Sequence, residues 1–152
     1  MKVLYFSDSI FPLAGLAGAM HTGRLPAGGK QGNNSRCLPF LITKKEDAGK
    51  VFFLGKDDLG NEVYALSVKG ERGMLYRLVD SFLAMYGIGE KEMSLVDSGI
   101  GDNLFLLAGI FCCRFPLLAP LGRTLIFTGL KKHWGRLVGL TARVRMSLVS
   151  LP

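Results

Sequence analysis

Residues 51–69, VFFLGKDDLGNEVYALSVK, contain two apolar stretches rich in strand-forming residues, on either side of a short polar segment. The polar segment, KDDLGN, consists mostly of residues that favour tight turns. Two strand-forming stretches joined in this way predict an antiparallel hairpin, with strands at 51–55 and 62–69. The elements on either side of this hairpin decide the fold class.

Strand-forming and helix-forming stretches alternate outside the hairpin. Further strands are predicted at 2–7, 93–98 and 124–129. Helices are predicted at 12–25, 73–88, 103–113 and 132–149, the third of them capped by Asp102 or Asn103. This alternation predicts an α/β fold, Rossmann-like in its order of elements: a single-domain three-layer sandwich. Its sheet is expected to be mixed, mostly parallel and five-stranded, with one antiparallel hairpin and helices on both faces.

The length of 152 residues suits one domain covering 1–152. Residues 26–50 are rich in glycine and asparagine, so a flexible loop is expected there. The 3 cysteines form neither a disulfide framework nor a zinc-binding spacing. Asp8 interrupts the first apolar run before a signal peptide can form, which predicts a cytoplasmic protein. Neither a metal nor a cofactor is predicted.

Residues 104–130 are strongly apolar, and the mean hydropathy of the chain is +0.30. The run from 104 to 113 ends at Arg114 and Pro116, well short of the about 20 residues that a membrane-spanning helix needs. A short helix that is apolar on all sides predicts a buried core helix instead of a span. Cys112 and Cys113 are then expected to be buried with it.

The positive charge of the chain is concentrated in its last third. The net charge is +7, and residues 103–152 contain no acidic residue. Lys132, Arg136 and Arg143 recur on one side of the last predicted helix. Residues 131–145 are therefore a candidate surface for an acidic protein or an anionic membrane, the alternative being a solvated basic face. Nucleic acid is disfavoured, because neither interleaved aromatic residues nor a known binding module accompanies the charge.

Small polar residues follow three of the predicted strands. In a mostly parallel sheet, ligands bind at the carboxyl ends of the strands. The candidate ligand-binding residues at these ends are Ser7, Asp8, Ser9, Asp97, Ser98, Gly99, Thr128 and Gly129. The alternative is that these residues only cap and turn the chain, as such residues do at many strand ends.

Both histidines have a structural interpretation. His21 lies towards the end of the first predicted helix and is a further ligand-binding candidate, or a partly buried structural residue. His133 stands beside Trp134 near the start of the last predicted helix, where a surface position is expected. Neither has a serine or cysteine nucleophile at a recognisable spacing, so no catalytic residue is predicted.

Two blocks of sequence, KVLY with AMHTGRLP at 19–26 and EDAGKVFFLGKDDLGNEVYALS at 46–67, resemble the bacterial domain-of-unknown-function 3189 family of spore-forming Firmicutes. That family has no established activity. In its typical members the first strand leads into a loop with two glycines, a histidine and two serines, suited to holding a phosphate. Here residues 8–14 read DSIFPLA, and Ala48 stands where a second histidine is typical.

These observations predict a non-catalytic binding or interaction module with a degenerate ligand site at the carboxyl ends of the strands. The first alternative is an enzyme or binder that acts on a small phosphorylated ligand at the same place. The second is a protein that binds a membrane surface or an acidic partner through its basic terminal helix.

Overall fold

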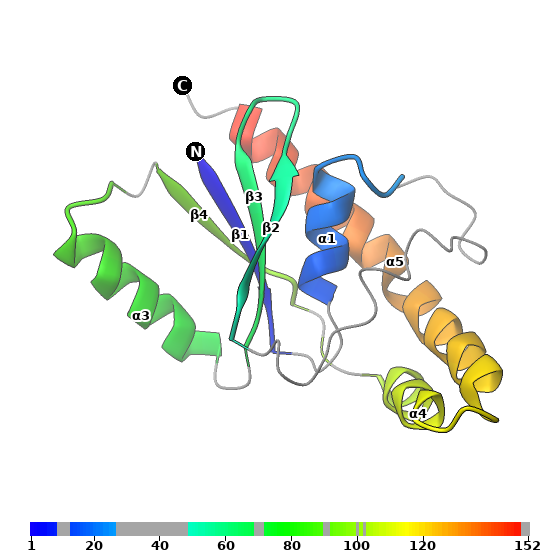
Figure 1. The fold of residues 1–152 in the computed structure, drawn as a ribbon. Helices are drawn as coiled ribbons and strands as arrows, with labels where there is room; N and C mark the ends of the chain where they lie inside the picture. The colour runs from blue at the N-terminus through cyan, green and yellow to red at the C-terminus, as the bar shows by residue number, and fades with distance from the viewer. Residues whose placement is uncertain are drawn as a thin grey trace.

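The computed structural model describes residues 1–8, 13–26, 49–68, 72–89, 92–99, 101 and 103–149 (Figure 1). The elements, in chain order, are β1 (Lys2–Ser7), α1 (Leu13–His21), β2 (Val51–Lys56), β3 (Glu62–Ser67), α3 (Arg72–Met85), β4 (Met93–Asp97), α4 (Leu104–Cys113) and α5 (Ala119–Val149). Most of the loop predicted to be flexible at 26–50 lies outside the described residues.

The four strands form one mixed sheet in the order β2-β3-β1-β4. The central strand β1 is parallel to both of its neighbours, β3 and β4, whereas β2 and β3 form the predicted antiparallel hairpin. The hairpin pairing is irregular between Phe53 and Gly55, and Gly55 has a φ of 135°, which favours glycine. The α/β class, the mostly parallel sheet and the hairpin are therefore confirmed.

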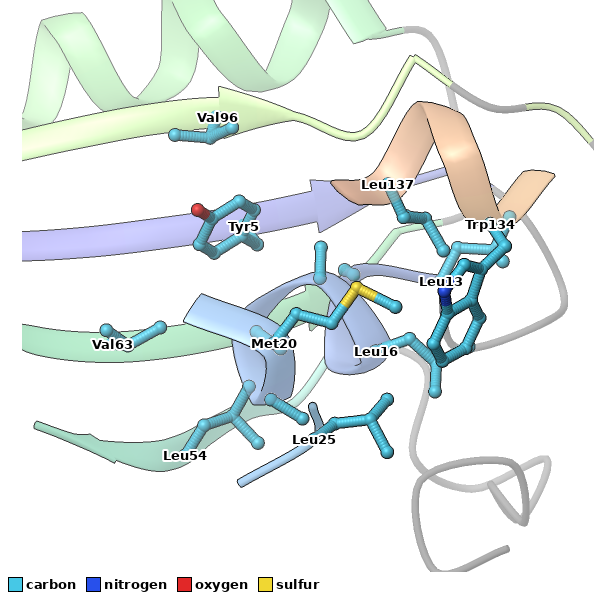
Figure 2. Close-up of a cluster of buried hydrophobic side chains, with 14 of the residues drawn as sticks. Tyr5, Leu13, Leu16, Met20, Leu25, Leu54, Val63, Val96, Trp134 and Leu137 are labelled. Atoms are coloured by element: carbon cyan, nitrogen blue, oxygen red, sulfur yellow. The ribbon is translucent and has the colours of Figure 1, made fainter. Parts of the chain in front are cut away.

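Alternating residues of β1 enter two separate apolar clusters. Val3 and Tyr5 belong to the larger cluster, which also contains side chains of α1 and α5 (Figure 2). Leu4 and Phe6 point to the opposite face, where they pack with Leu75 of α3. Most of the fully buried apolar side chains thus lie between the sheet and the helices α1 and α5.

The predicted fifth strand at 124–129 is wrong, because these residues lie within the 31-residue helix α5. Pro120 is in the first turn of this helix, where a missing N–H costs nothing. Thr124 and Thr128 donate their hydroxyls to the backbone oxygens of Pro120 and Thr124, at 3.1 and 2.9 Å. An apolar run with β-branched residues is thereby accommodated in a helix.

The predicted burial of the apolar helix at 104–113 is also wrong. Only Leu106 and Gly109 of α4 are buried, Cys112 is half-buried, and Cys113 is exposed. The reason is that α4 packs along α5 and lies away from the sheet (Figure 1). Within the described residues, no helix combines the length and the apolar character that crossing a membrane requires.

Candidate functional site

Three serines lie side by side where the parallel strands end. Ser7 of β1 is in register with Ser67 of β3, and the backbone N–H of Ser98, just after β4, donates to the carbonyl of Phe6 at 3.0 Å. Side chains alternate along a strand, so Ser7 points to the same face as Tyr5, towards α1 and α5. We call this end of the sheet the carboxyl edge.

Two of these serine hydroxyls are buried without a hydrogen-bond partner. Ser7 is 0% exposed and Ser98 is 5% exposed, and neither Oγ has a partner among the described residues. Burying a hydroxyl without a partner is unfavourable, and nearly all buried polar groups in proteins are satisfied. Such a pair at the carboxyl edge marks a place where a ligand can supply the missing hydrogen bonds.

Three more buried polar atoms without a partner among the described residues belong to Asn103 and His133. Of the two predicted caps of α4, Asn103 is the one that caps it, because its side-chain oxygen accepts a hydrogen bond from the N–H of Phe105 at 3.2 Å. Its Nδ2 has no partner among the described residues. His133 is 8% exposed, and neither ring nitrogen has a partner in the part of the chain that the structure describes. The predicted surface position of His133 is therefore wrong.

The packing of α4 on α5 indicates that Asn103 and His133 lie close together. A Cβ on Gly122 would meet Cys113, and a Cβ on Gly129 would meet Leu106, so the two antiparallel helices face each other in a regular register. His133 stands four residues, about one turn, after Gly129 in α5, so the same pairing of the two helices places it opposite the start of α4.

Across the described part of the chain, every buried side-chain nitrogen or oxygen without a partner belongs to Ser7, Ser98, Asn103 or His133.

These groups are suited to an anion. Burial lowers the pKa of His133, and the positive charges of Arg136 and Lys132 lower it further, so the imidazole is neutral at pH 7. It then offers one N–H donor beside the amide of Asn103. Helix α1 also begins near this end of the sheet (Figure 1), and a helix N-terminus presents free N–H groups to negative charge.

Five of the predicted site residues meet at the carboxyl edge: Ser7, Asp8, Asp97, Ser98 and Gly99. Asp97 is in register with Phe6, which places its side chain on the α3 side of the sheet, and its Oδ1 accepts from the N–H of Gly99 at 2.8 Å. Gly99 has a φ of 63°, which turns the chain after β4. Ser9 lies outside the described residues.

Thr128 and Gly129 do not end a strand, because both lie inside α5. Thr128 is exposed, whereas Gly129 is buried against Leu106 of α4. The prediction that these two residues lie at the end of a fifth strand therefore fails together with that strand.

His21 lies at the opposite end of the sheet, near the turn of the β2–β3 hairpin. Its fully buried ring is held by Tyr5, whose O–H donates to Nδ1 at 2.6 Å, and by Asp57, whose Oδ2 accepts from Nε2 at 3.1 Å. Both ring nitrogens are thus engaged, and the imidazole joins α1 to the hairpin. The structure does not bring His21 together with Ser7 or Ser98.

The protonation states of this network follow from burial and hydrogen bonding. Burial raises the pKa of Tyr5 and lowers the pKa of His21, and the nearby carboxylate of Asp57 offsets the second shift only in part. Burial also acts to raise the pKa of Asp57, but hydrogen bonds from Asn61, His21 and Leu59 together hold it below its ordinary value. At pH 7 an ionised Asp57 thus accepts from a neutral histidine.

Other candidate groups are placed as follows. Lys132, Arg136 and Arg143 are all exposed on α5. No cluster of three histidine, cysteine or acidic side chains suited to a metal ion occurs among the described residues.

The sequence prediction missed Asn103 Nδ2 and His133 as site groups. The available signal was the spacing of His133 at four residues from Gly129 and seven from Ile126, which in one continuous helix places all three on one face.

An α/β fold with buried, unpartnered donors at the carboxyl edge of a mostly parallel sheet defines a protein with a candidate ligand site. The chain belongs to the family described as "Protein of unknown function (DUF3189)", whose family model matches residues 2–146. The resemblance seen in the sequence is confirmed. No curated protein and no solved structure matches the chain.

Proposed function

We propose that this protein is a non-catalytic binding module for a small anionic ligand, carrying a phosphate or a carboxylate, at the carboxyl edge of its sheet. The observation that carries the proposal is that Ser7 and Ser98, at the carboxyl edge, and Asn103 and His133, at and opposite the start of α4, have buried polar atoms without a partner among the described residues. The N-terminus of α1, which begins near the same end of the sheet (Figure 1), adds free N–H groups there. A phosphate oxygen accepts hydrogen bonds from all of these donors.

A binding role is favoured over catalysis by the chemistry of the same groups. His133 is kept neutral by burial and by Arg136 and Lys132, and it is contributed by α5 beside the cap of α4, not by a strand end next to Ser7. Activation of a serine nucleophile requires a base within hydrogen-bond reach of the hydroxyl. Among the described residues, the hydroxyl of Ser7 has no such partner.

The test is a titration of the isotope-labelled protein with inorganic phosphate and with a nucleoside monophosphate, followed by backbone amide NMR shifts. Binding should move the amide signals of Ser98, Gly99 and Asn103, and Ser98→Ala and Asn103→Ala should weaken it. Thr128→Ala is the matched control, because Thr128 is exposed and its hydroxyl donates to the backbone oxygen of Thr124 within α5. Unchanged spectra at millimolar ligand, or shifts centred on α3, would overturn the proposal. Turnover of the bound compound would favour the enzyme alternative.

A second candidate function is binding of an anionic partner surface, an acidic protein or a membrane, through residues 131–145 of α5. The observation that favours it is the exposure of Lys132, Arg136 and Arg143 on one side of that helix. Its test is the triple glutamine variant described in the Discussion.

A further inference from the structure

The hairpin formed by α4, residues 114–118 and the first turn of α5 projects from one end of the molecule (Figure 1). We call residues 104–121 the α4–α5 tip. Helix α4 packs mainly against α5. One side of α4 is therefore left without a partner from the rest of the described chain.

The unpartnered side of the tip is apolar. Leu117 is 95% exposed and Leu104 is 78% exposed, which is unusual for large aliphatic side chains on a surface that faces only water. Leu104, Leu107 and Phe111 are spaced by three and four residues and so share one side of α4. The exposed large apolar residues of the tip are Leu104, Phe105, Leu107, Phe111, Phe115, Leu117, Leu118 and Leu121.

Close packing against α5 holds this apolar side outwards. A Cβ on Gly109 would lie 2.9 Å from the carbonyl oxygen of Gly122, and a Cβ on Gly122 would lie 2.7 Å from that of Gly109. Backbones that approach so closely interlock, so α4 cannot rotate about its axis to bury Phe111 without separating the two helices. The exposed face is a fixed property of the tip.

The charge around the tip indicates what covers it. Arg114 and Arg123 are exposed within or beside the apolar residues, and residues 103–152 contain no acidic side chain. A second copy of the tip would bring arginines against arginines, whereas the phosphates of an anionic bilayer would pair with them. Helix α3 also exposes apolar residues, but it carries the acidic residue Asp80 among its arginines Arg72 and Arg77, whereas no acidic residue accompanies Arg114 and Arg123.

We propose that the α4–α5 tip inserts into the surface of an anionic lipid bilayer, with its apolar side chains at the acyl boundary and Arg114 and Arg123 at the headgroup phosphates. A helix of about 15 Å, such as α4, is suited to lying in the interface and not to crossing it. This inference deepens the second proposed function by naming its surface, but it depends on different residues.

The test is co-sedimentation with vesicles of phosphatidylcholine mixed with phosphatidylserine, compared with vesicles of phosphatidylcholine alone. The wild type should bind the mixed vesicles more tightly than the neutral ones. Phe111→Ser with Leu117→Ser should weaken binding by about ten-fold or more, since both side chains would contact the acyl boundary. The matched control is Leu78→Ser with Met85→Ser, two residues of α3 that are exposed to a similar degree, and it should bind like the wild type.

Three outcomes would overturn the inference. If the tip variant binds as the wild type does while the triple glutamine variant of α5 does not, the basic face alone carries the function. If the α3 control weakens vesicle binding as much as the tip variant does, binding depends on exposed apolar residues in general and not on the tip. If the wild type does not bind vesicles, and light scattering detects a dimer of the wild type but not of the tip variant, the apolar side of the tip is covered by a second copy of the chain. Circular dichroism spectra of the variants establish that each one is folded.

Discussion

Gly109 and Gly122 face each other across α4 and α5 so closely that a Cβ on Gly122 would lie 2.7 Å from the carbonyl oxygen of Gly109. The contact is between backbones, so neither partner can move aside as a flexible side chain would. The position of α4 against α5 therefore depends on two residues that have no side chain.

Gly109→Ala should destabilise the protein by about 1–3 kcal/mol, because overpacking a tight contact outweighs the gain in helix propensity. Gly139→Ala in α5 is the matched control, since a Cβ there meets nothing within 4 Å. It should stabilise the protein by about 0.5–1 kcal/mol. Urea unfolding of the two variants measures both effects, and equal free energies of unfolding would show that the helices do not interlock.

Ser7→Ala should leave the free energy of unfolding unchanged or raise it, because the substitution removes a buried hydroxyl that has no partner. Tyr5→Phe offers the contrast, since the Tyr5 hydroxyl is buried and hydrogen-bonded to His21. Its loss leaves Nδ1 of His21 without a partner and should cost about 1–3 kcal/mol. Thermal unfolding measures both. A large loss of stability in Ser7→Ala would mean that this hydroxyl is a structural group, and it would weaken the proposed ligand site.

Stability should fall as the pH is lowered below about 6.5. Burial lowers the pKa of both His21 and His133, so between the lowered values and 6.5 the unfolded chain binds more protons than the folded one. The contribution of the two neutral histidines to the free energy of unfolding is fully present above their pKa in the unfolded chain. It is lost as the pH falls through their lower pKa values in the folded protein. Asp57, whose pKa is also lowered, adds a further loss below about 3.8.

The Tm measured between pH 7 and pH 5 checks this prediction. His133→Gln should make the pH dependence shallower, because one of the two titrating groups is removed. A Tm that stays constant or rises over this range would contradict the assigned directions of the pKa shifts.

Replacement of Lys132, Arg136 and Arg143 by glutamine should weaken binding to anionic vesicles or to an acidic partner without altering the fold. Each basic residue near an anionic membrane contributes about 1 kcal/mol, so three of them correspond to about 100-fold in affinity. Exposed charges contribute little to stability, so the Tm should be unchanged. Co-sedimentation and a pull-down from cell extract, each at low and at physiological salt, measure the effect. If the variant and the wild type behave alike in both, the basic face is merely solvated.

Sequence patterns determined the elements whose signals are local. The turn residues of KDDLGN lie between two strands as predicted, and Asn103, one of the two predicted caps, caps α4. Strand ends follow from the same patterns, which is why the amino-acid sequence alone points to Ser7 and Ser98 as site candidates. A turn or a cap depends on the residues within a few positions of it, and these are adjacent in the chain.

Only the tertiary structure decided the state of residues 124–129, TLIFTG. Their apolar and β-branched residues suit a buried strand or a helix, and local propensity does not choose between them. The choice depends on α4, because Gly122 and Gly129 meet Gly109 and Leu106 only when both segments are helical and adjacent. The burial of His133 and the exposure of Phe111 have the same cause. Both depend on which side of α5 is covered by α4, and on which side of α4 is covered by α5. The spacing of apolar residues within one helix does not show which side the other helix covers.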